Sequence, residues 1–332
     1  MLNLAASPRS WSSCLELTYF DLVLMSNNIR NLLYSALRIR LVEERIAHIY
    51  HSDLIQSPVH LSIGQESVAV GICANLKSAD WVFINYRGHA FYLAKGGPLP
   101  QFFAELMGRR TGLSKGKAGS MHLAAPSVGV IGASAVVAST ISHAVGAALA
   151  SKIRSQTGRV FVANFGDGAT EQGVFHESLN FASLYKLPVL FLCEDNGLAV
   201  HASARQRQSY QLPQLVTAYG IRFQDIHDGY DPDMVCEQSC NIIKYVRETQ
   251  QPAFLRIQAA RYREHVGPGE DFNFGYRDRK DLSDWVENDP LCKDTEDLAY
   301  FKEEIEAEID IAIEYAMNSD FPNIEDLLTD VE

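Results

Sequence analysis

The sequence predicts an α/β protein built on a doubly wound, mostly parallel sheet. Apolar runs at residues 160–165 and 189–193 flank an amphipathic stretch that begins near Thr170, which is a strand–helix–strand pattern. The same alternation returns between residues 221 and 262, where a helical period separates two further apolar runs. Because helical connections make neighbouring strands parallel and cover both sheet faces, the pattern favours this fold class.

The remaining elements follow from periodicity and punctuation. An apolar run at residues 81–84 predicts another strand, which ends at Asn85. Apolar residues at a helical spacing, with charged residues on the opposite face or small residues between them, predict helices at residues 29–50, 66–74, 141–151 and 294–317. The last of these is acidic and amphipathic, so we expect it to pack as a C-terminal extension of the domain.

Length and composition favour one large domain. The chain has 332 residues, of which 47% are hydrophobic, and no Pro/Ser-rich linker or repeat divides it. We expect residues 25–332 to form the domain. Residues 1–24 are interpreted as an unassigned N-terminal arm or a mis-assigned start, because Glu16 and Asp21 interrupt the apolar run that a signal peptide would need.

Charge, hydropathy and cysteine content narrow the class of protein. The net charge of −12 disfavours binding to nucleic-acid phosphates, and no apolar run approaches the roughly 20 residues of a membrane span. The six cysteines lack the paired spacing of zinc sites, and Cys236 and Cys240 are interpreted as thiols on one helix. We therefore expect a cytoplasmic protein without nucleic-acid or membrane partners.

Polar residues follow two of the predicted strands, at the point where each strand ends. Gly166-Asp167-Gly168 ends the first strand and Glu194-Asp195-Asn196-Gly197 ends the second, so both clusters lie at one edge of the sheet. Carboxylate and amide oxygens suit Mg²⁺ or Ca²⁺, and Mg²⁺ held by few protein groups commonly takes phosphate ligands. Glycines let backbone amides approach a phosphate. The residues alone thus predict a metal-bridged diphosphate site.

The same residues carry a family resemblance. Asn196 follows Asp167 by 29 positions, which resembles the thiamine diphosphate fingerprint. The sequence between them, from residue 173 onward, is similar to that of the alpha subunit of the decarboxylating component of 2-oxo acid dehydrogenase complexes, including the acetoin-cleaving type. Recognisable matches run from about Ile29 to the C-terminus. The resemblance implies a thiamine diphosphate-binding fold, specifically its diphosphate-binding domain.

Cofactor contacts are implied by the same resemblance. Thiamine diphosphate and Mg²⁺ would be the cofactors, with Mg²⁺ bound by Asp167, Asn196 and the Leu198 carbonyl. The backbone at Gly168 and Ala169 would complete the diphosphate site. By matching motifs, the remaining cofactor contacts would be Tyr86 and Arg87 at the diphosphate, the Gly129 carbonyl at the aminopyrimidine amine, and Ile131 as the wedge that bends the cofactor.

Two histidines match positions near the reactive centre of the family. His60 precedes the Ser-Ile-Gly-Gln-Glu segment, and His265 ends Arg261-Tyr262-Arg263-Glu264-His265. Histidine suits this place because its pKa lies near neutrality. Both are predicted catalytic residues, and His265 is also a predicted cofactor contact. Without the family, a lone histidine is more often structural.

Several segments depart from the family pattern. Arg263 and Glu264 replace a His and a Gly, which puts the acyl specificity in doubt, and four residues are missing between His122 and Gly129. Residues 115–122 resemble the family's Gly-Gly-Ser-Met-His loop and lack the spacing of a P-loop. Residues 201–212 align with the mobile loop of the family, and their sequence differs from the usual one. The serines in this segment are of a kind that mobile loops commonly contain.

The resemblance also implies partners and a reaction. The glutamate that activates the cofactor would come from a beta-type chain, in an α2β2 heterotetramer, and the acyl group of a small 2-oxo acid would pass to the lipoyl group of an acyltransferase. Two alternatives stay open. One is a two-chain carboligase or transketolase-like enzyme that transfers an acyl unit to an aldehyde or ketone, and the other is an inert cofactor-binding or assembly subunit.

Overall fold

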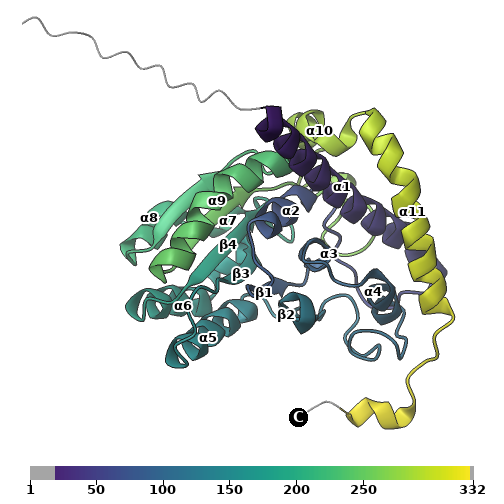
Figure 1. Cartoon of the computed structure of the whole chain (residues 1–332), viewed down its shortest axis with the longest axis horizontal. Helices are drawn as coiled ribbons and strands as arrows, with labels where there is room; N and C mark the ends of the chain where they lie inside the picture. The colour runs from purple at the N-terminus through teal and green to yellow at the C-terminus, as the bar shows by residue number, and fades with distance from the viewer. Residues whose placement is uncertain (1–18, 330–332) are drawn as a thin grey trace, which may run out of the picture.

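A computed structural model describes the backbone of residues 19–329, with side chains from residue 29 onward (Figure 1). Most of the predicted N-terminal arm, residues 1–18, lies outside the described residues. The next residues belong to α1 (Tyr19–Ile49), so the helix predicted at residues 29–50 extends further toward the N-terminus. Within residues 19–329, no helix is long and apolar enough to cross a bilayer.

One six-stranded sheet organises the molecule, and every neighbouring pair of its strands is parallel. The predicted α/β class with a mostly parallel sheet is therefore confirmed. Across the sheet the strands follow the order β2 (Val130–Ser134), β1 (Trp81–Asn85), β3 (Phe161–Gly166), β4 (Val189–Asp195), β8 (Ala253–Gln258) and β7 (Arg222–Ile226).

Helices cover both faces of this sheet, so its central strands are apolar on both sides. Alternate residues of β3 and β4, such as Phe161 and Phe191, pack toward one apolar cluster, and Val162 and Leu190 pack toward the other. The first cluster includes residues of α5 (Ser139–Ile153), α6 (Gly173–Leu184) and α8 (Leu212–Ala218). The second includes residues of α1, α2 (Glu66–Ala74), α3 (His89–Ala94), α4 (Leu99–Leu106), α9 (Pro232–Thr249) and α11 (Glu296–Met317).

The C-terminal helix α11 lies beside α1 (Figure 1). Arg38 on α1 bonds Glu308 on α11 at 2.6 Å, and Leu298, Phe301 and Ile305 are buried. The predicted packing role of this amphipathic helix is thus visible in its contacts. Shorter helices lie before it: α7 (Ala204–Arg207) and α10 (Ser283–Asn288).

Two local predictions need correction. The helix expected from about Thr170 begins at Gly173, because residues 167–171 form a 3₁₀ turn in which the Thr170 hydroxyl donates to the Asp167 carbonyl at 2.7 Å. The sequence reading also missed β2. The strand is short, and its sequence, VIGAS, contains glycine, so the residue pattern does not indicate a strand. Pairing with β1 holds these residues in the strand conformation instead.

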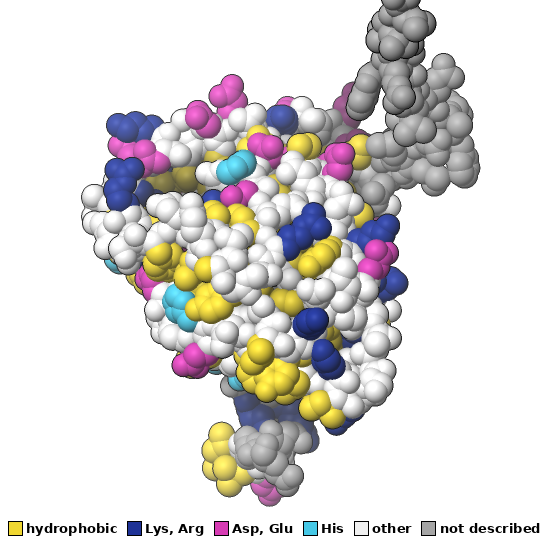
Figure 2. All heavy atoms as spheres, turned by 90° about the vertical axis from the view of Figure 1, so that its left-hand side faces the viewer, with side chains coloured by type: hydrophobic (Ala, Val, Ile, Leu, Met, Phe, Trp, Pro, Cys, Tyr) yellow, Lys and Arg dark blue, Asp and Glu magenta, His cyan; other side chains and the backbone are white. Residues whose placement is uncertain are grey.

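The face that carries α6 and α8 exposes several groups of apolar side chains (Figure 2). On α5, on α6 and at the residue after α6, the exposed large apolar residues are Ile153, Phe181, Leu184 and Tyr185. Exposed apolar groups of this kind are common on faces that bind another protein.

Candidate active site

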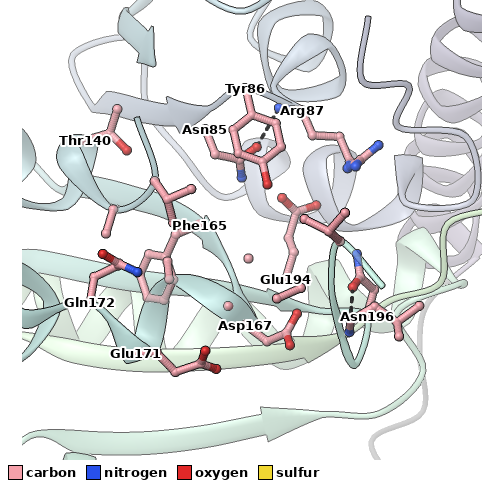
Figure 3. Close-up of a pocket in the computed structure, with 18 of the residues that line it drawn as sticks. Asn85, Tyr86, Arg87, Thr140, Phe165, Asp167, Glu171, Gln172, Glu194 and Asn196 are labelled. Atoms are coloured by element: carbon pink, nitrogen blue, oxygen red, sulfur yellow. Dashed lines mark hydrogen bonds between the residues drawn. The ribbon is translucent and has the colours of Figure 1, made fainter. Parts of the chain in front are cut away.

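A cavity of about 220 Å³ lies at the carboxyl ends of β1, β2, β3 and β4 (Figure 3). This is the edge of a parallel sheet at which α/β proteins bind ligands. Tyr86 and Arg87 lie on one side of the cavity, and Asp167 and Asn196 lie on the other. Of the predicted site residues, the cavity is lined by Tyr86, Arg87, Asp167, Gly168, Ala169, Asn196, Leu198 and His265.

Asp167 is the buried carboxylate of this cavity. It directly follows β3, and only 3% of its surface is exposed. Burial, together with the nearby charge of Asp195, raises its pKa to about 6, although Arg207 donates to its Oδ2 at 2.6 Å and opposes that shift. A buried carboxylate with one cation beside it is suited to a second cation, because positive charge relieves the cost of its burial.

Asn196 faces Asp167 from the end of β4. Its Oδ1 accepts the Leu198 amide at 3.1 Å, and its Nδ2 donates to Gln65 Oε1 at 3.3 Å. These contacts fix the amide so that its oxygen turns toward the tight 196–198 turn, and they leave one lone pair on Oδ1 for another donor or a metal. Leu198 starts the short strand β5 (Leu198–Ala199), which pairs with β6 (Ala202–Ser203).

Gly168 has a steric reason to be glycine. A Cβ atom at this position would lie 2.8 Å from the Ala199 Cβ, so only glycine lets the β5–β6 hairpin pack against the turn after β3. At Gly166 a Cβ would meet only the Glu194 carbonyl oxygen, at 3.9 Å. Gly168 is therefore the glycine of this turn that lets the hairpin carrying Leu198 lie close to Asp167.

Arg87 enters the cavity from the loop after β1. Its guanidinium donates to the Leu61 carbonyl at 2.8 Å and to the His265 carbonyl at 3.0 Å, and burial lowers its pKa to about 10. The backbone of this loop is held by Asn85, whose Oδ1 accepts the Arg87 amide at 2.7 Å. Arg87 is thus a fixed, buried cation with further donors available to an anion.

His60, Tyr86 and His265 form an aromatic group beside Arg87. Ring centroids lie 4.5 Å apart for His60 and Tyr86 and 5.3 Å apart for the two histidines. Burial, followed by repulsion from Arg87, lowers the pKa of His60 to about 3 and that of His265 to about 4. Both imidazoles are neutral at pH 7, and among residues 29–329 the buried His60 Nδ1 has no hydrogen-bond partner. An unpartnered polar atom beside the cavity fits a site that binds a polar ligand.

His60→Gln is expected to weaken the dependence of stability on pH. An unfolded histidine takes up a proton as the pH falls below about 6.5, whereas folded His60 does so only near pH 3, so acidification favours the unfolded chain. Between pH 7 and 5 the wild type should lose up to about 2 kcal/mol of unfolding free energy through this residue. Urea unfolding at both pH values measures the difference. His143→Gln, at an exposed position, is the control, and equal losses in wild type and His60→Gln would contradict the prediction.

Three predicted site residues lie outside the cavity lining: His60, Gly129 and Ile131. The Gly129 carbonyl accepts the Val82 amide at 2.8 Å, and Gly129 adopts a left-handed conformation with φ of 84° just before β2. Ile131 is half-buried in β2, where it packs against the cluster formed with α5 and α6. The roles of Gly129 and Ile131 toward the aminopyrimidine ring stay predictions.

Sequence reasoning missed several polar residues of the cavity. Buried Glu194 accepts Asn164 Nδ2 at 2.7 Å and Gln65 Nε2 at 3.3 Å, and burial raises its pKa despite these bonds. Asn85 and Glu171 also line the cavity. The sequence did carry a signal for Asn85, because this residue ends an apolar strand in the same way that Asn196 follows one. Gln65, by contrast, comes from the start of a distant helix, so only the fold brings it here.

The donor set fits a hard cation that shares its ligands with a phosphate. Within residues 29–329, no group of three or more His, Cys, Asp or Glu side chains is arranged to hold a metal ion. Asp167 and Asn196 offer one carboxylate and one amide oxygen, and the Leu198 backbone lies beside them. A Mg²⁺ ion here would need outside oxygen ligands, and Arg87 supplies positive charge for an anion that brings them.

Fold and cavity together define a parallel-sheet α/β protein with a buried polar site at the carboxyl edge of its sheet. The sequence model of the dehydrogenase E1 component family matches residues 34–325, and the chain belongs to that family. It is accordingly an alpha-type subunit of a thiamine diphosphate-dependent 2-oxo acid dehydrogenase, and the resemblance found in the sequence is confirmed.

Curated relatives agree in length as well as in sequence. The alpha subunit of acetoin:2,6-dichlorophenolindophenol oxidoreductase from Bacillus subtilis is 33% identical over 89% of this chain and 90% of its own length. The pyruvate dehydrogenase E1 component subunit alpha of Porphyra purpurea is 32% identical, over 86% of this chain and 87% of its own length. The corresponding Rickettsia typhi subunit is 32% identical, over 89% and 93% respectively.

Among solved structures, a Pichia stipitis transketolase in complex with xylulose 5-phosphate shares the fold. The TM-score is 0.55 at 16% identity, with 87% of this chain and 46% of the transketolase covered. The chain thus spans about half the length of that protein, and the likeness supports the fold alone.

Proposed function

We propose that this chain is the alpha subunit of a heterotetrameric enzyme that decarboxylates pyruvate or a similar 2-oxo acid and passes the acyl group to a lipoyl carrier. The observation that carries the proposal is the convergence of Asp167, Asn196 and Arg87 on one cavity, beside the neutral His60 and His265. Relatives named for pyruvate and acetoin support the substrate class.

Mg²⁺ and thiamine diphosphate would be held by residues of different elements. Asp167, Asn196 and the Leu198 carbonyl would bind Mg²⁺, and Arg87, Tyr86 and the backbone at Gly168 and Ala169 would bind the diphosphate. When bound, thiamine diphosphate supplies the nucleophilic carbon and the electron sink that decarboxylation of a 2-oxo acid needs.

The histidines would act on the substrate rather than on the diphosphate. A neutral imidazole can donate a hydrogen bond to a carboxylate or accept a proton, and the low pKa values of His60 and His265 keep both groups neutral at pH 7. Arg87 donates to the His265 carbonyl, so the cation that would bind the diphosphate also positions this histidine.

A beta-type partner would complete the site and supply the activating glutamate. Two observations support such a partner. Val136 lines the cavity with 66% of its surface exposed, beside Val137, so the rim is apolar and open. The exposed apolar residues of α5 and α6 add further surface of the same kind. We also propose an α2β2 assembly, a lipoyl acyltransferase as acceptor and a cytoplasmic location, which five free cysteines within the described residues suit.

The departures from the family motif lie away from the cavity. Arg263 lines a separate groove with Tyr262 and Phe272, and Glu264 accepts the Gly269 amide at 2.8 Å. Only His265 of this segment reaches the cavity. Arg263 and Glu264 therefore shape a neighbouring loop and do not line the cavity, which favours the dehydrogenase function over the carboligase alternative.

Carbon dioxide release from pyruvate tests the proposal directly. The chain is co-expressed with its candidate beta chain and assayed with Mg²⁺ and thiamine diphosphate, once with an artificial oxidant and once with an aldehyde acceptor. We expect oxidant-driven turnover that falls at least about tenfold in Asn196→Ala, because a metal ligand is lost. Turnover only with the aldehyde would favour the carboligase, and failure to bind thiamine diphosphate would favour an inert subunit.

A further inference from the structure

The segment that follows Asn196 returns to the metal-binding carboxylate. Its β5–β6 hairpin leads into α7, and Arg207 at the end of α7 donates from Nη2 to Asp167 Oδ2 at 2.6 Å. The other Arg207 nitrogen, Nη1, bonds Glu171 Oε1. One guanidinium therefore bridges the two acidic residues of the turn after β3, and Asp167 lies between Glu171 and Asn196 in Figure 3.

The Arg207 bridge is buried and fully hydrogen-bonded. Only 10% of the Arg207 side chain is exposed, and its Nε donates to the Ala202 carbonyl at 3.0 Å, so the guanidinium has partners at all three nitrogens. Gln208 adds bonds to Thr170 Oγ1 and Glu171 Oε1, both at 3.0 Å. Tyr210 OH donates to the Thr170 carbonyl at 3.0 Å. Residues 198–210 are thus tied along the turn that carries Asp167.

We propose that Arg207 is a positioning residue of the metal site, which fixes the Asp167 carboxylate for Mg²⁺ and fastens residues 196–207 to the turn that carries Asp167 and Glu171. The inference rests on the proposed Mg²⁺ site. With Oδ2 held by Arg207, Asp167 offers the metal Oδ1 as a single, oriented ligand. Outer partners that orient a metal ligand typically contribute 10- to 100-fold in metal affinity.

The arrangement also links the metal to the segment. Asn196 and Leu198 begin the segment and Arg207 ends it, so both ends of residues 196–207 contact the same site. Arginine suits this role better than lysine, because its planar group reaches two carboxylates at once. A lysine would reach one of them and hold Asp167 less firmly.

The first test measures Mg²⁺ binding to the complex of this chain with its beta partner in saturating thiamine diphosphate, by isothermal titration. Arg207→Ala should raise the Mg²⁺ dissociation constant about 10- to 100-fold, with Arg207→Lys between that variant and the wild type. Arg205→Ala is the matched control, because Arg205 is exposed on the same short helix. The thermal midpoints of all variants are compared, since a merely structural role would move those midpoints and leave the dissociation constant unchanged.

The second test needs no ligand. Trypsin cleavage after Arg205 should proceed faster in Arg207→Ala than in the wild type, because the segment loses its fastening to Asp167 and Glu171. Unchanged Mg²⁺ binding in Arg207→Ala would overturn the proposal, and tighter binding would overturn it and make Arg207 a competitor of the metal. If the wild type binds no Mg²⁺, the proposed metal site fails, and equal cleavage rates would then overturn the fastening role of Arg207 separately.

Discussion

Asp167→Asn is expected to lower Mg²⁺-dependent turnover at least about 100-fold. Asparagine keeps the shape of the side chain and removes the only carboxylate among the three proposed metal ligands, so the hard cation loses its charged ligand. The substitution also weakens the contact with Arg207, whose Nη2 bonds Asp167 Oδ2 at 2.6 Å. Both effects act against the metal site in the same direction.

Turnover and Mg²⁺ affinity are measured together for Asp167→Asn. Glu177→Gln is the matched control, because Glu177 is exposed on α6 and the substitution removes the same charge nearby. Circular dichroism verifies that the variant folds. Wild-type Mg²⁺ affinity in Asp167→Asn would show that the metal is bound elsewhere, and unchanged turnover with weak affinity would show that the metal is dispensable.

Glu105→Gln is expected to destabilise the chain by about 3–6 kcal/mol, through the loss of charge-assisted hydrogen bonds and the burial of unpaired donors. Glu105 is fully buried on α4, and the loop at residues 112–119 wraps around its carboxylate. Four loop amides donate to it: Ser114 at 2.7 Å, Gly116 at 3.0 Å, Ala118 at 2.7 Å and Gly119 at 3.1 Å. In the glutamine variant, the NH₂ group would face two of these donors.

Urea unfolding of the purified chain measures this loss for Glu105→Gln. Glu303→Gln, at an exposed position of α11, removes the same charge and should stay within about 0.5 kcal/mol of the wild type. The loop matters beyond its own stability, because Ser120 follows it and the Ser120 hydroxyl contacts His89 Nε2 at 2.8 Å. A Glu105→Gln variant as stable as the wild type would show that water satisfies the loop amides.

The contacts of Glu105 also explain why the glycine-rich loop around it is not a phosphate-binding site. The spacing already lacked the P-loop pattern, and the structure adds a physical reason. Four of its amides are occupied by an internal carboxylate, which takes the place that a phosphate would need. No local pattern predicts this pairing, because Glu105 lies on a helix and its partners lie in the following loop.

The sequence by itself determined five of the six strands of the main sheet, several of its covering helices and the sheet edge at which Asp167 and Asn196 lie. Periodicity is a local property, so the runs that became β3 and β4 were readable, and a parallel sheet then puts Asp167 and Asn196 at one edge. The short strand β2 was not predicted, because its glycine and small residues show no hydrophobic periodicity. Its strand conformation depends on pairing with β1.

Only the tertiary structure decided which side chains meet in the cavity. Arg207 bonds Asp167 across 40 positions, and His60 lies beside His265 although the two are far apart in the chain. The lowered pKa values of both histidines likewise depend on burial and on the approach of Arg87. Such contacts depend on how helices and loops pack over the strand ends. The sequence pattern specifies the elements, and the three-dimensional packing sets the distances, burial and charge that give the site its chemistry.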